Sequence, residues 1–87
     1  MRDRSIELQL NDTDLRNAYL PSADLQGAYL HKVHFEDADL PGVVLRSATL
    51  RQAHLQHAWL PEADLEEADL RGARLAAVFL SCAMQSL

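Results

Sequence analysis

The sequence repeats a unit of five residues, and this period excludes most ways of folding the chain. Leu occupies every fifth position from Leu10 to Leu80, with Phe35 as the single exception, and a small residue, usually Ala, lies two positions before most of them. On an α-helix a five-residue step rotates by about 500°, or roughly 140° net, so these side chains would surround the helix without forming a core face. An α-helical fold is therefore excluded.

A continuous strand is excluded as well. Side chains alternate between the two faces of a strand, so Leu residues five positions apart would point to opposite faces. Ala63 and Leu65, two positions apart within one unit, would share a face. The chain must therefore turn between units, and short extended segments joined by tight turns predict a β-solenoid.

A second period indicates the number of sides in each coil. Pro21, Pro41 and Pro61 recur every twenty residues, and multiples of twenty also separate Tyr19, Trp59 and Phe79. Twenty residues are four units. A four-sided coil places these positions directly above one another at a strand spacing of about 4.8 Å, whereas a three-sided coil scatters them.

The unit itself points to a known family. The stretch from Ala63 to Gly72 reads ADLEEADLRG, two copies of Ala, Asp, Leu and two variable residues. This pattern, in register from Leu8 to Cys82, resembles the pentapeptide repeat proteins. The resemblance implies an all-β fold, a right-handed quadrilateral parallel β-helix of about four coils with Leu and Ala inside.

Length and register predict a single domain over residues 1–87. We expect a strand leading into the first coil at residues 1–9, regular repeats at 10–80 and a C-terminal end at 81–87. No apolar run is long enough for a secretory signal or a membrane span, so we expect a cytoplasmic protein without a membrane partner. Cys82 is the single cysteine and cannot form an internal disulfide.

Charge is sorted by side, although the formal net charge is only -5. Asp before Leu belongs to the repeat pattern, so part of the acidity is expected to be structural. We predict that the basic side, which bears Arg51, Arg71 and Arg74, can contact the acidic side of a second copy. That acidic side bears Glu66, Glu67 and Asp69, and salt should screen the contact. The predicted charged interaction face comprises His34, Arg51, His54, Arg71 and Arg74.

Three of the histidines are candidate metal ligands. His34 and His54 are one coil apart and His31 is near, but zinc needs three or four ligands, and no Cys or carboxylate is positioned to complete the set. The sequence also has no glycine-rich phosphate loop and no Ser-His-Asp arrangement. We therefore expect no metal, no cofactor and no enzymatic activity.

The end of the chain predicts a homodimer interface. Side-chain charge disappears after Arg74, and even outward positions become apolar. A solenoid end left open exposes strand edges and core side chains, and a two-fold pair would cover both ends. Alternatively these residues fold over the end as a cap, or the chain was cut from a longer protein. The predicted interface comprises Trp59, Ala76, Val78, Phe79, Leu80, Met84 and Leu87.

Three classes of function remain. The leading hypothesis is a non-catalytic interaction or scaffold module with an unidentified protein partner. The resemblance implies a second, a DNA mimic that binds a type II topoisomerase, but four coils give a rod of only about 20 Å. The third is an enzyme or metal-binding protein using the histidines. The charge argues against nucleic-acid binding, because a chain with a pI near 5.1 lacks the positive excess of domains that bind nucleic acid.

Overall fold

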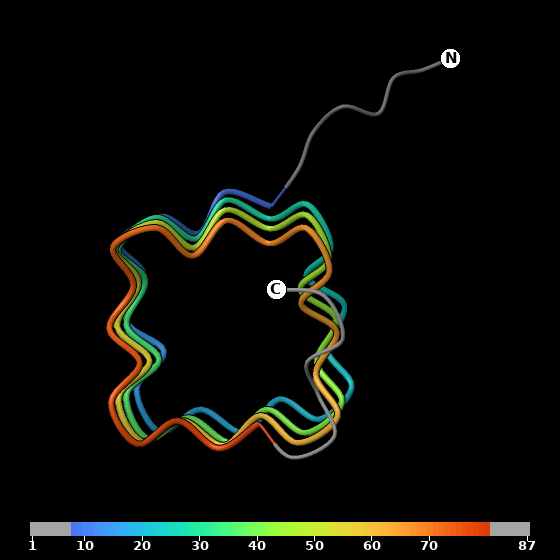
Figure 1. Cartoon of the computed structure of the whole chain (residues 1–87), viewed down its shortest axis with the longest axis vertical. Coiled ribbons are helices and arrows are strands. Elements are labelled where there is room, and N and C mark those ends of the chain that lie inside the picture. Colours follow the sequence, from blue (N-terminus) through green and yellow to red (C-terminus); the bar gives the residue numbers. More distant parts are fainter. Residues whose placement is uncertain (1–7, 81–87) are drawn as a thin grey trace.

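The structure is a computed structural model that describes residues 8–80, and it shows the chain wound into a square coil (Figure 1). Parallel bridges join residues twenty positions apart, from Gln9 with Tyr29 to Trp59 with Phe79. Within residues 8–80 there is no helix and no continuous strand, only isolated bridges separated by turns. The predicted four-sided solenoid is therefore confirmed.

Each side of the coil is a column of bridge residues, and we name each face after one of its members. The residue before and the residue after each inward Leu point outward on the same face, because side chains alternate along an extended segment. The bridge columns are Gln9, Tyr29, Thr49 and Asp69 (the Tyr29 face); Asp14, His34, His54 and Arg74 (the His34 face); Tyr19, Asp39, Trp59 and Phe79 (the Trp59 face); and Asp24, Val44 and Asp64 (the Val44 face).

The core consists of stacked Leu side chains with Ala or Val beside them. Leu30, Phe35 and Leu50 are 0% exposed, and the partner positions Ala28 and Val33 are also 0% exposed. Burying one Leu in such a stack contributes about 1.5–3 kcal/mol. The five-residue period therefore stabilises the coil because every unit adds one large and one small side chain to a continuous interior.

A tight turn follows every inward residue from Leu10 to Leu75. In each one the amide three residues later donates to the carbonyl of the inward residue, as in the 3.0 Å bond from Ala53 to Leu50. The second turn residue always has a positive φ, between 56° at Ser22 and 73° at Gly72, as type II turns require. From Asp12 to His57 its amide donates to the next coil, as Lys32 does to the Arg51 carbonyl at 2.9 Å, and this bond holds the unfavourable backbone conformation in place.

The first turn residue explains the positions of proline. Its amide takes no part in the ladder, so Pro21, Pro41 and Pro61 remove no backbone hydrogen bond, and proline favours this turn position. Several other units satisfy the same amide with the Asp before the Leu. Asp64 Oδ1, for example, accepts the Glu66 amide at 3.1 Å.

Burial falls toward both ends of the described coil. Leu55 is 2% exposed, whereas Leu75, one coil further along the same column, is 43% exposed, and Leu8 at the other end is 48% exposed. The predicted segments 1–9 and 81–87 lie outside the described residues except for Leu8 and Gln9. Gln9 already pairs with Tyr29, so the ladder begins there.

Candidate functional surfaces

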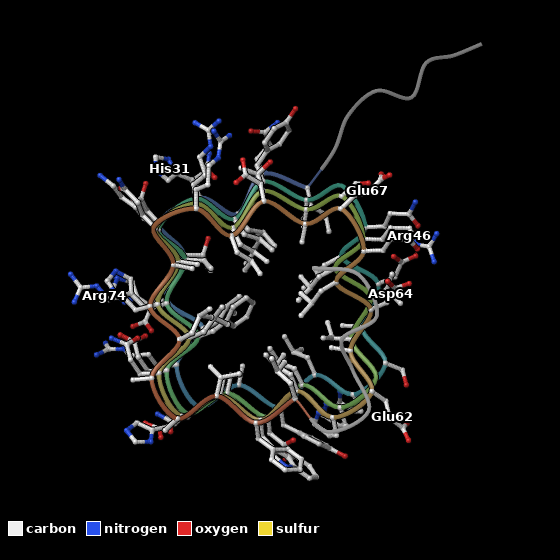
Figure 2. All side chains as sticks on the ribbon, viewed as in Figure 1. His31, Arg46, Glu62, Asp64, Glu67 and Arg74 are labelled. Atoms are coloured by element: carbon white, nitrogen blue, oxygen red, sulfur yellow. The ribbon has the colours of Figure 1, made fainter. Side chains whose placement is uncertain are left out.

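The predicted charged interaction face is divided between two adjacent faces of the coil. Arg51 and Arg71 follow the inward Leu residues of the Tyr29 face, while His34, His54 and Arg74 form the bridge column of the His34 face. Figure 2 shows this separation, with His31 and Arg74 pointing out from neighbouring sides. The assignment to one side was wrong because the corner falls between residues 31 and 34, not before them.

The two arginines on the Tyr29 face are held by one carboxylate. Asp69 Oδ2 accepts from Arg51 Nε at 2.9 Å and from Arg71 Nη2 at 2.7 Å. The side-chain bonds from Arg71 and then Arg51 hold the pKa of the Asp69 carboxyl well below its usual value. This part of the predicted basic surface is therefore locally compensated.

A similar cluster lies on the Val44 face. Arg46 Nη2 contacts Asp64 Oδ2 at 2.9 Å, and Arg46 Nη1 contacts Glu66 Oε1 at 3.2 Å (Figure 2). The Glu66 backbone amide and the Arg46 side chain lower the pKa of Asp64. Two of the three acidic residues predicted to meet a second copy, Glu66 and Asp69, thus have cationic partners within their own chain.

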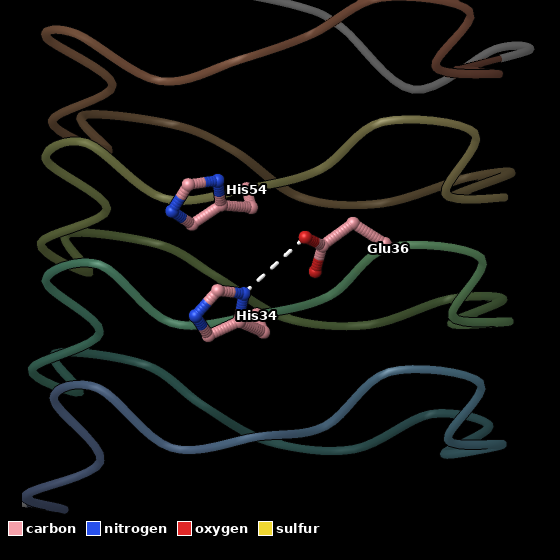
Figure 3. Close-up of side chains that lie close together, drawn as sticks. All are labelled: His34, Glu36 and His54. Carbon is pink, nitrogen blue, oxygen red and sulfur yellow. Dashed lines mark hydrogen bonds and ion pairs between the residues drawn. The ribbon is translucent and has the colours of Figure 1, made fainter.

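The His34 face brings two imidazoles and a carboxylate together. The His34 and His54 rings stack with centroids 4.4 Å apart and planes 3° from parallel. Glu36 Oε2 lies 3.2 Å from His34 Nδ1 (Figure 3). The expectation that no carboxylate accompanies these histidines was therefore wrong, because Glu36 follows the inward Phe35 and so returns to the same face as His34.

A hollow lies at the corner between the Tyr29 and His34 faces, which we call the Gly72 corner. Gly72 lacks a side chain there, and a hollow of about 460 Å³ opens beside it, lined by Lys32, Gln52, His54, Gly72 and Arg74. An adjoining hollow of about 220 Å³ is lined by Arg51, Gln52, Arg71 and Gly72. Four of the five residues predicted for the charged face therefore border this corner, from both sides of it.

Lys32 and Arg74 differ from the other cations of the corner. Within residues 8–80 neither forms an ion pair, whereas Arg51 and Arg71 both contact Asp69. No acidic residue lines either hollow. The Gly72 corner thus presents two uncompensated cations and His54 around one concave surface, which suits an anionic group.

The predicted dimer interface is partly visible on the Trp59 face. Trp59 and Phe79 stack with ring centroids 6.0 Å apart, and each is 45% exposed. Ala76 is exposed, whereas Val78 and Leu80 are partly buried. Met84 and Leu87, which were also predicted to contribute, lie outside the described residues.

Comparisons with known proteins define the class of protein. The family model for pentapeptide repeats matches eight copies over residues 9–46 and 48–81, so the chain belongs to the pentapeptide repeat family. The square coil is accordingly a right-handed quadrilateral β-helix, a fold that is generally non-enzymatic and serves structure or interaction. Within the described residues no helix is long and apolar enough to cross a membrane.

Among the solved structures similar to this chain are two pentapeptide repeat proteins from cyanobacteria. HetL, a pentapeptide repeat protein involved in heterocyst differentiation regulation in the cyanobacterium Nostoc sp. strain PCC 7120, is 32% identical over 82% of this chain, with a TM-score of 0.48. Rfr23 from the cyanobacterium Cyanothece 51142 is 23% identical over 91% of this chain and 67% of its own, with a TM-score of 0.49. The present chain spans 38% of the length of HetL. A search of curated proteins found no match.

Proposed function

We propose that this protein is a non-catalytic interaction module that associates with a second copy through the C-terminal end of its coil. The observation that carries the proposal is the loss of burial at that end. Leu75 is 43% exposed and Phe79 is 45% exposed, whereas the equivalent residue one coil before Leu75, Leu55, is 2% exposed. Burying apolar surface of this kind against a partner removes it from water, which stabilises the complex.

The backbone at the same end supports the proposal. The amides of Leu55 and His57 donate to the carbonyls of Arg74 and Ala76 in the next coil, at 2.9 and 3.0 Å. The corresponding amides of Leu75 and Ala77 have no backbone acceptor among residues 8–80. An unpaired edge is a surface on which another chain can add hydrogen bonds. A two-fold axis would join two such edges and cover both.

Light scattering on the purified chain tests the association. At about a hundred micromolar, well above a micromolar dissociation constant, we expect a mass about twice 9.7 kDa. Phe79→Glu should return the mass to that of one chain, because a carboxylate would have to be buried at the contact. The matched control is Tyr19→Glu, in the same column at the other end and 66% exposed.

The control decides how the result is interpreted. Tyr19→Glu should keep the dimeric mass, since its position is three coils away from Phe79 in the same column. A wild-type chain that stays monomeric at this concentration would contradict the proposal. Loss of association in both variants would show that the C-terminal end is not the contact.

A second surface is favoured by a separate observation, the uncompensated cations of the Gly72 corner. We propose that this corner binds an acidic segment of a protein partner. A peptide carrying several Asp and Glu residues should bind in low salt and weaken as the ionic strength rises, because exposed charges are screened over about 10 Å at 0.1 M salt. Lys32→Gln together with Arg74→Gln should abolish this binding.

The control for the corner uses cations outside it. Arg16→Gln removes a cation that contacts Asp14 at 2.8 Å on the lower part of the His34 face, so it should leave peptide binding unchanged. Equal weakening in both variants would indicate a general charge effect. Binding of a neutral peptide with the same affinity would contradict an electrostatic contact.

A further inference from the structure

We propose that His34, Glu36 and His54 form a binding site for a divalent transition-metal ion such as Zn²⁺. The three side chains come from two consecutive coils of the His34 face and project from the same surface (Figure 3). Each offers one ligand atom, and these atoms all lie within 4.8 Å of one another. Imidazole nitrogen and carboxylate oxygen are both accepted ligands of Zn²⁺, which also accommodates water as a fourth ligand.

The coil fixes the positions from which the ligands start. The His34 amide donates to the Thr13 carbonyl and the His54 amide to the Val33 carbonyl, both at 2.9 Å, and the two histidines are bridged to each other. The spacing of the two backbones is thereby fixed by the ladder. Because the ladder already orders the backbone, binding an ion would restrict only the side chains. This lowers the entropic cost of holding an ion between residues that are far apart in sequence.

The remaining movement is small. Ligand atoms around a tetrahedral Zn²⁺ with bonds of about 2.0–2.1 Å lie roughly 3.3 Å apart. His34 Nδ1 and Glu36 Oε2 are already 3.2 Å apart, so the adjustment falls mainly on His54. Its ring must tip out of the parallel stack so that its lone pair converges on the ion.

The polar atoms beside the imidazoles support a cation. Glu36 Oε1 and Gln56 Oε1 are buried and have no hydrogen-bond partner among residues 8–80. They occupy equivalent positions on consecutive coils, each following an inward residue of the His34 face. A buried oxygen without a partner is costly. A cation bound at Glu36 Oε2 would also place a compensating positive charge beside Oε1 of the same carboxylate.

The charges around the cluster affect where an ion would lie. Glu36 supplies the one carboxylate of the cluster. Arg74 opposes binding, because it follows His54 in the same column and places a positive charge on its far side. The ion is expected between His54 and Glu36, away from Arg74.

Calorimetric titration of the whole chain with zinc chloride tests this site at pH 7.5. We expect one Zn²⁺ per chain, and a loss of affinity of at least about tenfold in His34→Ala, His54→Ala and Glu36→Gln, since each removes one ligand. Arg74→Gln should tighten binding. His57→Ala is the matched control, because His57 is a corner residue outside the cluster and should bind Zn²⁺ as the wild type does.

A second measurement separates a metal site from a change in folding. Co²⁺ in place of Zn²⁺ should give the visible absorption of a tetrahedral complex, and His34→Ala and His54→Ala should lose it while keeping the wild-type circular dichroism spectrum. Absence of binding at millimolar Zn²⁺, equal weakening in His57→Ala, or half an ion per chain would each overturn the proposal. The site does not depend on self-association, so Phe79→Glu should still bind one ion.

Discussion

At the residue scale, the Asp before the inward Leu has a structural task that accounts for part of the negative charge. Asp14, Asp24, Asp64 and Asp69 each accept the backbone amide of the residue two positions later, at 3.1–3.2 Å. That amide belongs to the first turn residue and has no partner in the ladder. The acidic composition therefore reflects the turns as well as the surface, and it is weak evidence for a cationic partner.

The carboxylate of Asp69 predicts a dependence of stability on acid pH. Its pKa in the folded chain lies below the usual value because Arg71 and Arg51 bond it, so its contribution is present above pH 4 and is lost as the pH falls through the folded-state pKa. Asp69→Asn should flatten the fall in thermal midpoint below about pH 4. Asp37→Asn is the control, because Asp37 forms no ion pair within residues 8–80. Parallel curves for wild type and Asp69→Asn would contradict the assignment.

The inward Leu residues predict the largest single-residue effects. Leu50→Ala should lower the free energy of unfolding by about 2–5 kcal/mol, because Leu50 is 0% exposed and the coil leaves a cavity where its side chain was. Arg51→Ala, one position later, should cost less than about 1 kcal/mol, since its ion pair with Asp69 is exposed to solvent. Denaturant unfolding compares the two. Equal losses would contradict the inward and outward positions.

At the scale of the element, one turn repeated along the chain determines the shape. Every turn needs a positive φ at its second residue, yet only some units place Gly or Asn there, while others use Lys32, Glu62 or Ala77. Such residues adopt this conformation at a cost of about 1–2 kcal/mol. The hydrogen bonds between coils must therefore outweigh local preference, which is why no turn signal is visible at many corners of the sequence.

Gly27 allows the cost of this turn to be measured. Its φ is 70°, and a Cβ built on it would meet nothing within 4 Å, so a substitution there tests backbone conformation without a steric clash. Gly27→Ala should destabilise the chain by about 1 kcal/mol. Gly27→Asn should cost less, because Asn tolerates this region. Thermal or denaturant unfolding should rank the three as Gly, Asn and then Ala, and an Ala variant as stable as the wild type would contradict the strain.

The same elements explain what could be predicted from sequence. The five- and twenty-residue periods predict the fold and its core because each applies to the whole chain. The surface clusters join residues two positions apart across an inward side chain, as His34 and Glu36 do, or eighteen apart, as Arg51 and Asp69 do. Finding them requires knowing where each corner lies to within a residue, and the period alone leaves that open. Ion pairing within the chain also neutralises part of the basic surface that a count of charges predicts.

At the scale of the whole molecule, the surface argues against imitation of DNA. Residues 8–80 form 73/20, or about 3.6 coils, which at about 4.8 Å per coil span roughly five base pairs at about 3.4 Å each. Asp14, Asp64 and Asp69 are moreover paired with arginines. In a supercoiling assay with a type II topoisomerase and an inhibitor of that enzyme, we predict that adding the chain leaves the degree of inhibition unchanged. A dose-dependent recovery of supercoiling would contradict this prediction.

Because bridges join residues twenty positions apart, the face and the coil on which a surface residue lies depend only on its position in the sequence. Removing five residues between His34 and His54 would leave a continuous coil, because the repeat is restored, but every later side chain would move to the neighbouring face. Removing twenty consecutive residues would remove one coil and keep every later side chain on its original face. His54 lies above His34 because of the number of residues between them. In such a chain, a short in-frame duplication or deletion of repeat units can rearrange the outer surface while the interior stays the same.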